Sequence, residues 1–187
     1  MSFYNAPITN QVPNGVVSII QLHAYISTNE WLRERTSRTR VALDDEKRFK
    51  QLKQSSCPTS RPPGYSPTER RTGCFFPRVN WLSISIISPR PRRLVRGETR
   101  CSPTSGYAPT SPSISPSNTG VKLFVPYRLS VTATIEWAFD EARRSAWEYL
   151  EWRYGLKADT SNADLSRACF LCHDSSAKAE KSWSIEN

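Results

Sequence analysis

The sequence contains little of what most enzymes and membrane proteins use. It has 2 His, 1 Met and 7 Gly in 187 residues. No stretch matches the glycine-rich phosphate loops of nucleotide-binding enzymes, and no apolar run approaches the roughly 18–20 residues of a membrane span. The longest apolar stretch, Val16 to Ile26, follows no cationic residue, which argues against a secretory signal peptide. We therefore expect an intracellular protein, nuclear or cytoplasmic, without a transmembrane segment.

Apolar residues are also scarce. Only 37% of the residues are hydrophobic, and 14 Pro outnumber 7 Gly. This composition predicts a modest core with substantial irregular structure. The cysteines are odd in number and irregularly spaced, which predicts reduced thiols rather than a disulfide framework. They are Cys57, Cys74, Cys101, Cys169 and Cys172.

The clearest local pattern runs from Val121 to Leu156. In its first half, apolar residues alternate with polar ones, which is typical of a half-buried strand. Phe124 is the exception, because it is apolar at a position where the alternation expects a polar residue. Pro126 cannot donate to a ladder, so it predicts an edge strand or a bulge. An amphipathic helix follows, with Thr134 as its N-cap and Gly155 as a left-handed C-cap. The pattern predicts a strand–helix unit that anchors a core.

The polar face of this helix predicts ion pairs between residues four apart, Asp140 with Arg144 and Arg144 with Glu148. Three tryptophans fall outside its apolar arc: Trp137, Trp147 and Trp152. They either close the edge of a small core, which is the favoured interpretation, or offer a surface to another chain.

The rest of the pattern favours a small, incomplete α+β fold. Ser27 and Glu30 have the spacing of a capping box, which predicts a helix from Glu30 towards Gln54. The weak helix formers from Thr36 to Thr39 predict a break in it. A second capping spacing, at Ser161, predicts a short helix through about Cys172. The fold then has strands over 16–26, 79–88 and 121–132 and helices over 40–54 and 134–154.

Between residues 55 and 120 the composition changes. Eleven of the 14 prolines lie there, with abundant Ser and Thr. Such a low-complexity segment buries too little apolar surface to offset its chain entropy, which predicts disorder except for the strand at 79–88. The predicted organisation is an N-terminal strand and basic helix (1–54), a mostly disordered Pro/Ser/Arg-rich segment (55–120) and a C-terminal strand–helix unit with a polar tail (121–187).

The net charge of +9 is concentrated in the middle of the chain. Residues 1–29 carry no charged side chain, whereas residues 30–100 hold 17 Lys and Arg against 7 Asp and Glu. Arginine clusters of this kind attract nucleic-acid phosphates or acidic proteins, and a solvated linker without a partner is the alternative. The candidate nucleic-acid-binding residues are Arg33, Arg35, Arg38, Arg40, Arg90, Arg92, Arg93 and Arg96.

One short motif suggests other chemistry. Cys169, Cys172 and His173 have the spacing of a c-type haem attachment site, and the same groups suit zinc or a dithiol redox pair. The sequence offers no clear second axial ligand for haem and no second Cys/His pair to close a zinc site. We therefore expect no cofactor and no metal, with the cysteines facing a small core.

No residues combine into a recognisable catalytic set, so we expect a non-catalytic protein. The favoured hypothesis is a basic binding protein whose arginine-rich middle engages RNA or DNA. Two alternatives remain open: a small redox or metal/haem protein using Cys169, Cys172 and His173, and a recently emerged reading frame without a defined biochemical activity.

Overall fold

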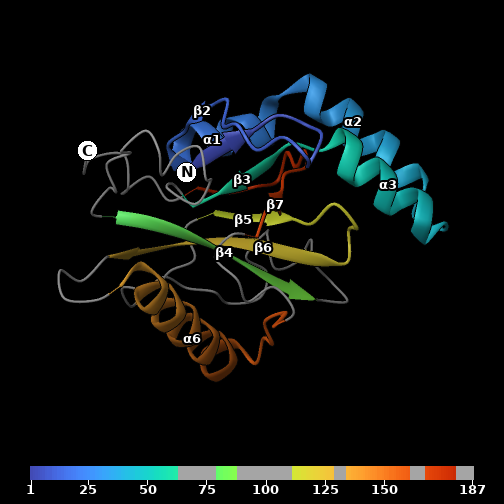
Figure 1. Ribbon diagram of the computed structural model, residues 1–187. Coiled ribbons are helices and arrows are strands. Elements are labelled where there is room, and N and C mark those ends of the chain that lie inside the picture. The colour runs from blue at the N-terminus through green and yellow to red at the C-terminus, as the bar shows by residue number, and fades with distance from the viewer. Residues whose placement is uncertain (63–78, 88–110, 129–133, 161–166, 180–187) are drawn as a thin grey trace.

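The chain has an α+β fold, as predicted. The computed structural model describes residues 1–62, 79–87, 111–128, 134–160 and 167–179 (Figure 1). Within them lie four helices: α1 (Ile19–Thr28), α2 (Glu30–Val41), α3 (Glu46–Ser56) and α6 (Ile135–Tyr154). One antiparallel sheet has the order β2 (Gly15–Val16), β1 (Ser2–Tyr4), β3 (Thr59–Arg61), β7 (Cys169–Phe170). The other has the order β4 (Val79–Ile87), β6 (Gly120–Arg128), β5 (Ser111–Ile114).

Strand β6 is the centre of the second sheet. The strands predicted at 79–88 and 121–132 are confirmed as β4 and β6, although residues 88 and 129–132 lie outside the described ranges. The edge position that Pro126 predicted for β6 is wrong, because β4 and β5 flank it. Pro126 stands opposite Trp81 of β4 and lies beyond the last described β5–β6 pair, Ser111 with Phe124. A central strand therefore accommodates the proline where its described pairing with β5 has ended.

Helix α6 covers one face of this sheet (Figure 1). The predicted caps are confirmed: the Thr134 hydroxyl accepts from the Trp137 N–H at 3.2 Å, and Gly155 has φ 64°. Alternate residues of β6 and the apolar arc of α6 form one buried cluster. Its β6 and α6 members are Val121, Leu123, Val125, Tyr127, Phe139, Ala146 and Leu150.

The opposite face of β6 is covered as well. Phe124, the residue that broke the alternation, is 1% exposed and packs on α1 and the β7 segment. The buried members of this second cluster are Met1, Ile19, Leu22, Ile26, Phe124, Cys169 and Leu171. The molecule thus has three layers: α6, the β4–β6–β5 sheet, and α1 with the small sheet (Figure 1).

The strand predicted over residues 16–26 is wrong. Only Val16 belongs to a strand, and α1 starts at Ile19. Ser18 forms a capping box with Gln21, in which the Ser18 Oγ accepts from the Gln21 N–H at 3.2 Å and the Ser18 N–H donates to Gln21 Oε1 at 2.8 Å. Leu22 and Ile26 then fall on the buried helix face with Ile19. In a continuous apolar run this capping signal is easily overlooked.

The predicted capping box of Ser27 with Glu30 is not formed. Asn29 caps α2, and its Oδ1 accepts from the Leu32 N–H at 2.8 Å. The Ser27 hydroxyl instead donates to the His23 carbonyl oxygen at 2.9 Å within α1. Ser27 therefore lies inside the preceding helix.

The long helix predicted after residue 30 does divide into two, but later than expected. Thr36 and Thr39 lie within α2, and their hydroxyls donate to the carbonyl oxygens one turn back, those of Leu32 at 2.7 Å and Arg35 at 2.9 Å. The break falls between α2 and α3, at residues 42–45. Asp45 then caps α3 by accepting from the Arg48 N–H at 3.0 Å.

The helix predicted through Cys172 is wrong over the residues that are described. Residues 169–170 form β7, which pairs with β3, and residues 161–166 lie outside the described ranges. Asp174 holds the following segment in place, because its carboxylate accepts from the Ile114 N–H at 2.8 Å and from the Ser176 hydroxyl at 2.6 Å. The disorder predicted over 55–120 is wrong for residues 55–62 and 111–120, which contain β3 and β5. The rest of that prediction falls on residues 63–78 and 88–110, which lie outside the described ranges.

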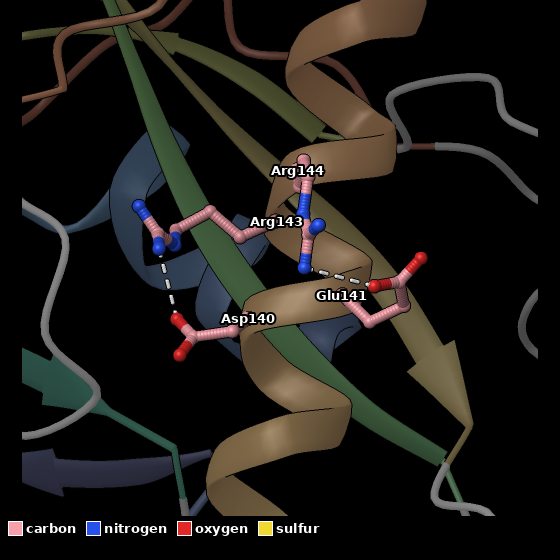
Figure 2. Close-up of polar contacts among 4 residues, drawn as sticks. All are labelled: Asp140, Glu141, Arg143 and Arg144. Carbon is pink, nitrogen blue, oxygen red and sulfur yellow. Dashed lines mark hydrogen bonds and ion pairs between the residues drawn. The ribbon is translucent and has the colours of Figure 1, made fainter.

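The surface of α6 differs from the predicted pairing. Figure 2 shows two ion pairs between residues three apart, Asp140 with Arg143 at 2.8 Å and Glu141 with Arg144 at 3.1 Å, in place of pairs four apart. Of the tryptophans, Trp147 packs against the core, whereas Trp137 and Trp152 are 57% and 80% exposed. No helix in the described ranges has the length and apolar content to cross a membrane.

Candidate functional site

Helix α2 carries four of the predicted nucleic-acid-binding arginines, and two of them form ion pairs with neighbouring carboxylates. Arg33 is ion-paired with Glu30, and Arg38 with Glu34 at 2.5 Å. All four side chains are more than half exposed. These guanidinium groups face solvent, but a carboxylate beside each weakens the local positive potential.

The other two arginines of α2 have contacts within the fold. The Arg35 guanidinium lies 5.0 Å from the centroid of the Trp31 ring. Arg40 donates to the carbonyl oxygens of Pro116 at 3.3 Å and Ser115 at 3.4 Å, in the turn between β5 and β6. Arg40 therefore ties α2 to the central sheet.

The neighbouring helix α3 carries cations that sequence reasoning did not select. Lys47, Arg48 and Lys50 are exposed, and no carboxylate within the described ranges pairs with them. Helices α2 and α3 lie side by side at one edge of the molecule (Figure 1). The remaining predicted residues, Arg90, Arg92, Arg93 and Arg96, lie outside the described ranges.

A cavity of about 370 Å³ lies where the two sheets approach each other. Three cationic side chains line it: Lys53 from α3, Lys122 from β6 and Arg167 from the segment before β7. Asp159 is the carboxylate on the described part of the wall, and its backbone N–H donates to the Ser85 carbonyl oxygen at 2.8 Å. Among the charged side chains of the described wall, cations therefore outnumber carboxylates.

The two lysines meet at Phe170. Lys122 Nζ donates to the Phe170 carbonyl oxygen at 2.7 Å, and Lys53 Nζ lies 5.1 Å from the Phe170 ring centroid and 5.4 Å from that of Phe49. Burial lowers the pKa of Lys53, and the positive charge of Lys122 lowers it further. The ammonium groups are thus close enough to repel each other.

Hydroxyl and thiol groups complete the cavity wall. The Cys169 thiol sulfur accepts from Lys122 Nζ at 3.2 Å and from the Ser83 hydroxyl at 3.2 Å. Ser60 is wholly buried, and its hydroxyl has no hydrogen-bond partner among the described residues. A buried hydroxyl without a partner is unusual, since burial costs free energy unless a hydrogen bond compensates.

The groups of the Cys-x-x-Cys-His motif do not converge. Cys172 is 3% exposed and donates to the Ile114 carbonyl oxygen at 2.9 Å, and burial raises its pKa to about 12. Its neighbour His173 donates its backbone N–H to the Thr36 hydroxyl at 2.8 Å. Within the described ranges, no three His, Cys, Asp or Glu side chains are grouped to hold a metal ion.

The arrangement suits binding of an anion. The sequence contained one signal for the cavity: Lys122 alternates with the apolar residues of β6 and so shares a face with Phe124, which the structure buries. The approach of Lys53 and Arg167 to that face depends on contacts between segments far apart in the chain.

Comparison with known proteins gives one similarity. Residues 112–178 match the family model described as BT4734-like, N-terminal domain. This range runs from β5 to the segment after β7 and includes Lys122, Arg167 and Cys169, but not α2 or α3. No curated protein and no solved structure matches the chain. The chain is therefore similar to this family over about a third of its length.

Proposed function

We propose that the protein is a non-catalytic basic protein that binds nucleic acid through contacts to phosphates. The observation that carries the proposal is the exposed group Lys47, Arg48 and Lys50 on α3, with which no described carboxylate forms an ion pair. Unpaired surface cations bind phosphates and release condensed counterions, independently of base sequence. The cationic excess of residues 30–100 supports the same function.

In this proposal, the α2 arginines contribute less to phosphate binding than the cations of α3. Arg33 and Arg38 share their charge with carboxylates, and Arg40 has a structural contact. The arginines at positions 90, 92, 93 and 96 belong to the proposal on grounds of sequence alone. The proposal includes a location in the nucleus or cytoplasm, where nucleic acid is accessible.

Fluorescence anisotropy with a labelled oligonucleotide, measured at several salt concentrations, tests the proposal. We expect log K to fall linearly with log salt concentration, with a slope of about −0.7 per phosphate contact for a single strand. Lys47→Gln with Lys50→Gln should weaken binding more than Arg33→Gln with Arg38→Gln. Both double variants remove two positive charges, so the comparison separates unpaired cations from paired ones.

Three results would contradict the proposal. The first is the absence of binding at low salt, and the second is affinity that does not depend on salt. The third is binding to polyglutamate as tight as binding to the oligonucleotide, which would instead identify an acidic protein as the partner.

A further inference from the structure

Among the described residues, the cavity between the sheets is lined by more cationic side chains than carboxylates. Within the described ranges, Lys53, Lys122 and Arg167 have no ion pair with a carboxylate. The polar contacts of the two lysines are with the Phe170 carbonyl oxygen, the Cys169 sulfur and aromatic rings. These partners are neutral or weak acceptors, so the positive potential in the cavity remains.

The cavity wall also holds hydrogen-bond donors suited to an oxyanion. The buried Ser60 hydroxyl has no partner among the described residues, and Ser83 and Ser85 of β4 also line the cavity. Ammonium, guanidinium and hydroxyl donors around one space match the three terminal oxygens of a phosphate monoester better than the two of a carboxylate. The missing partner of Ser60 is a separate observation from the charge, and both indicate an anion.

The size of the cavity limits the ligand. Its volume of about 370 Å³ falls at the low end of small-molecule sites, which measure roughly 300–1,000 Å³. The rings of Phe49 and Phe170 provide apolar wall beside the lysines. Such a space accommodates a phosphorylated small molecule of mononucleotide size.

We propose that this cavity binds a small phosphate monoester, with Lys53, Lys122 and Arg167 neutralising the phosphoryl group and Ser60 donating to it. The ligand restores the hydrogen bond that Ser60 lacks and relieves the repulsion between Lys53 and Lys122. The described lining of the cavity does not include Lys47, Arg48 or Lys50, so the site is distinct from the surface of the proposed function and its test is independent of nucleic-acid binding.

Isothermal titration calorimetry of the full chain with AMP, inorganic phosphate and adenosine tests the inference. We expect AMP and phosphate to bind and adenosine not to bind. Lys122→Met and Arg167→Gln should each weaken AMP binding about tenfold or more, the effect expected for one charge-assisted contact. Arg144→Gln is the matched control, because it removes the same charge from the exposed surface of α6 and should leave AMP affinity unchanged.

Ser60→Ala gives a second readout. Since the Ser60 hydroxyl has no partner among the described residues, its removal should not lower the thermal stability of the protein, yet it should weaken AMP binding. Arg167 is exposed, so Arg167→Gln keeps the test valid if Lys122→Met does not fold. No heat with AMP or phosphate would overturn the inference, and so would adenosine binding as tightly as AMP or equal losses in Arg144→Gln and Arg167→Gln.

Discussion

The two faces of strand β6 are covered in different ways, although alternate residues of one strand supply both. The face towards α6 is apolar along its length, from Val121 to Tyr127. On the opposite face, Phe124 is buried, and Lys122, two positions earlier in the strand, lines a cavity. The comparison shows that a polar residue in an alternating strand need not face solvent.

The two faces of β6 also differ in whether they offer a binding site. The α6 face buries apolar side chains and leaves no charge in the cluster. The cavity face collects three cations from distant segments and a hydroxyl without a described partner. Cavities with a few convergent polar groups are typical of binding sites. We therefore assign ligand binding to the cavity face, whereas buried apolar packing on both faces stabilises the fold.

The largest expected effect tests whether the cavity face also contains a true core. Phe124→Ala should lower the free energy of unfolding by about 3–5 kcal/mol, because it empties a fully buried site between β6 and α1. Urea denaturation followed by tryptophan fluorescence measures this change. Val125→Ala, on the α6 face, should cost about 2 kcal/mol. A smaller loss for Phe124→Ala than for Val125→Ala would show that only the α6 face stabilises the fold.

The next largest loss in the free energy of unfolding is expected in the segment that follows β7. Asp174→Ala leaves the buried Ile114 N–H without its acceptor and should cost about 2–3 kcal/mol. Ser176→Ala removes only the hydroxyl bond to the same carboxylate and should cost about 1 kcal/mol. Equal losses of unfolding free energy in the two variants, measured by urea denaturation, would mean that the hydrogen bond from the Ile114 N–H does not stabilise the fold.

Alkaline pH should destabilise the buried layer through Cys172. Burial raises its pKa in the folded state from 9.0 to about 12, so the thiol ionises first in the unfolded chain. Stability is then fully present below pH 9 and is lost as pH rises towards 12, by roughly 1 kcal/mol per pH unit for one group. Cys172→Ser keeps a donor for the Ile114 carbonyl oxygen but does not ionise in this range.

The pH dependence of unfolding in the two proteins isolates this contribution, because other titrating groups are common to both. The free energy of unfolding should fall more steeply above pH 9 in the wild-type protein than in Cys172→Ser. Parallel curves would show that the Cys172 thiol does not stay neutral in the fold.

The smallest effects distinguish the arginines of α2. Arg40→Gln removes two hydrogen bonds to the β5–β6 turn and should lower the free energy of unfolding by about 1–2 kcal/mol. Arg38→Gln breaks an exposed pair with Glu34 and should cost less than about 0.5 kcal/mol. Thermal melts of both variants give the comparison. A larger loss for Arg38→Gln would mean that Arg40 is not a structural contact.

The part of the fold predicted from sequence is the part governed by local signals. The β6–α6 unit could be predicted because alternation, Thr134 and Gly155 all indicate the same elements. Helix α1 was missed because an apolar run fits a strand or a helix, and the decisive Ser18–Gln21 cap is only four residues long. The position of β6 in the centre of its sheet depends on strand order, which local patterns do not determine.

The positive charge of the candidate site could be predicted from the sequence, but the residues that form the site could not. Composition identified a basic region, but the arginines of α2 have partners, whereas Lys47, Arg48 and Lys50 of α3 form no ion pair with any described carboxylate. The cavity could not be predicted because Lys53, Lys122 and Arg167 are separated by more than forty residues at each step. Tertiary packing alone brings them to one space.

Thiol labelling tests the contrast between the two faces most directly. Cys169 is 8% exposed and lines the cavity, whereas Cys172 is 3% exposed and its thiol is held neutral at physiological pH. Iodoacetamide labelling with peptide-resolved mass spectrometry follows each cysteine separately. We expect Cys169 to react faster than Cys172, and excess AMP to slow Cys169 several-fold while excess adenosine has no effect. An unchanged Cys169 rate with AMP would contradict the assignment of binding to the cavity face of β6.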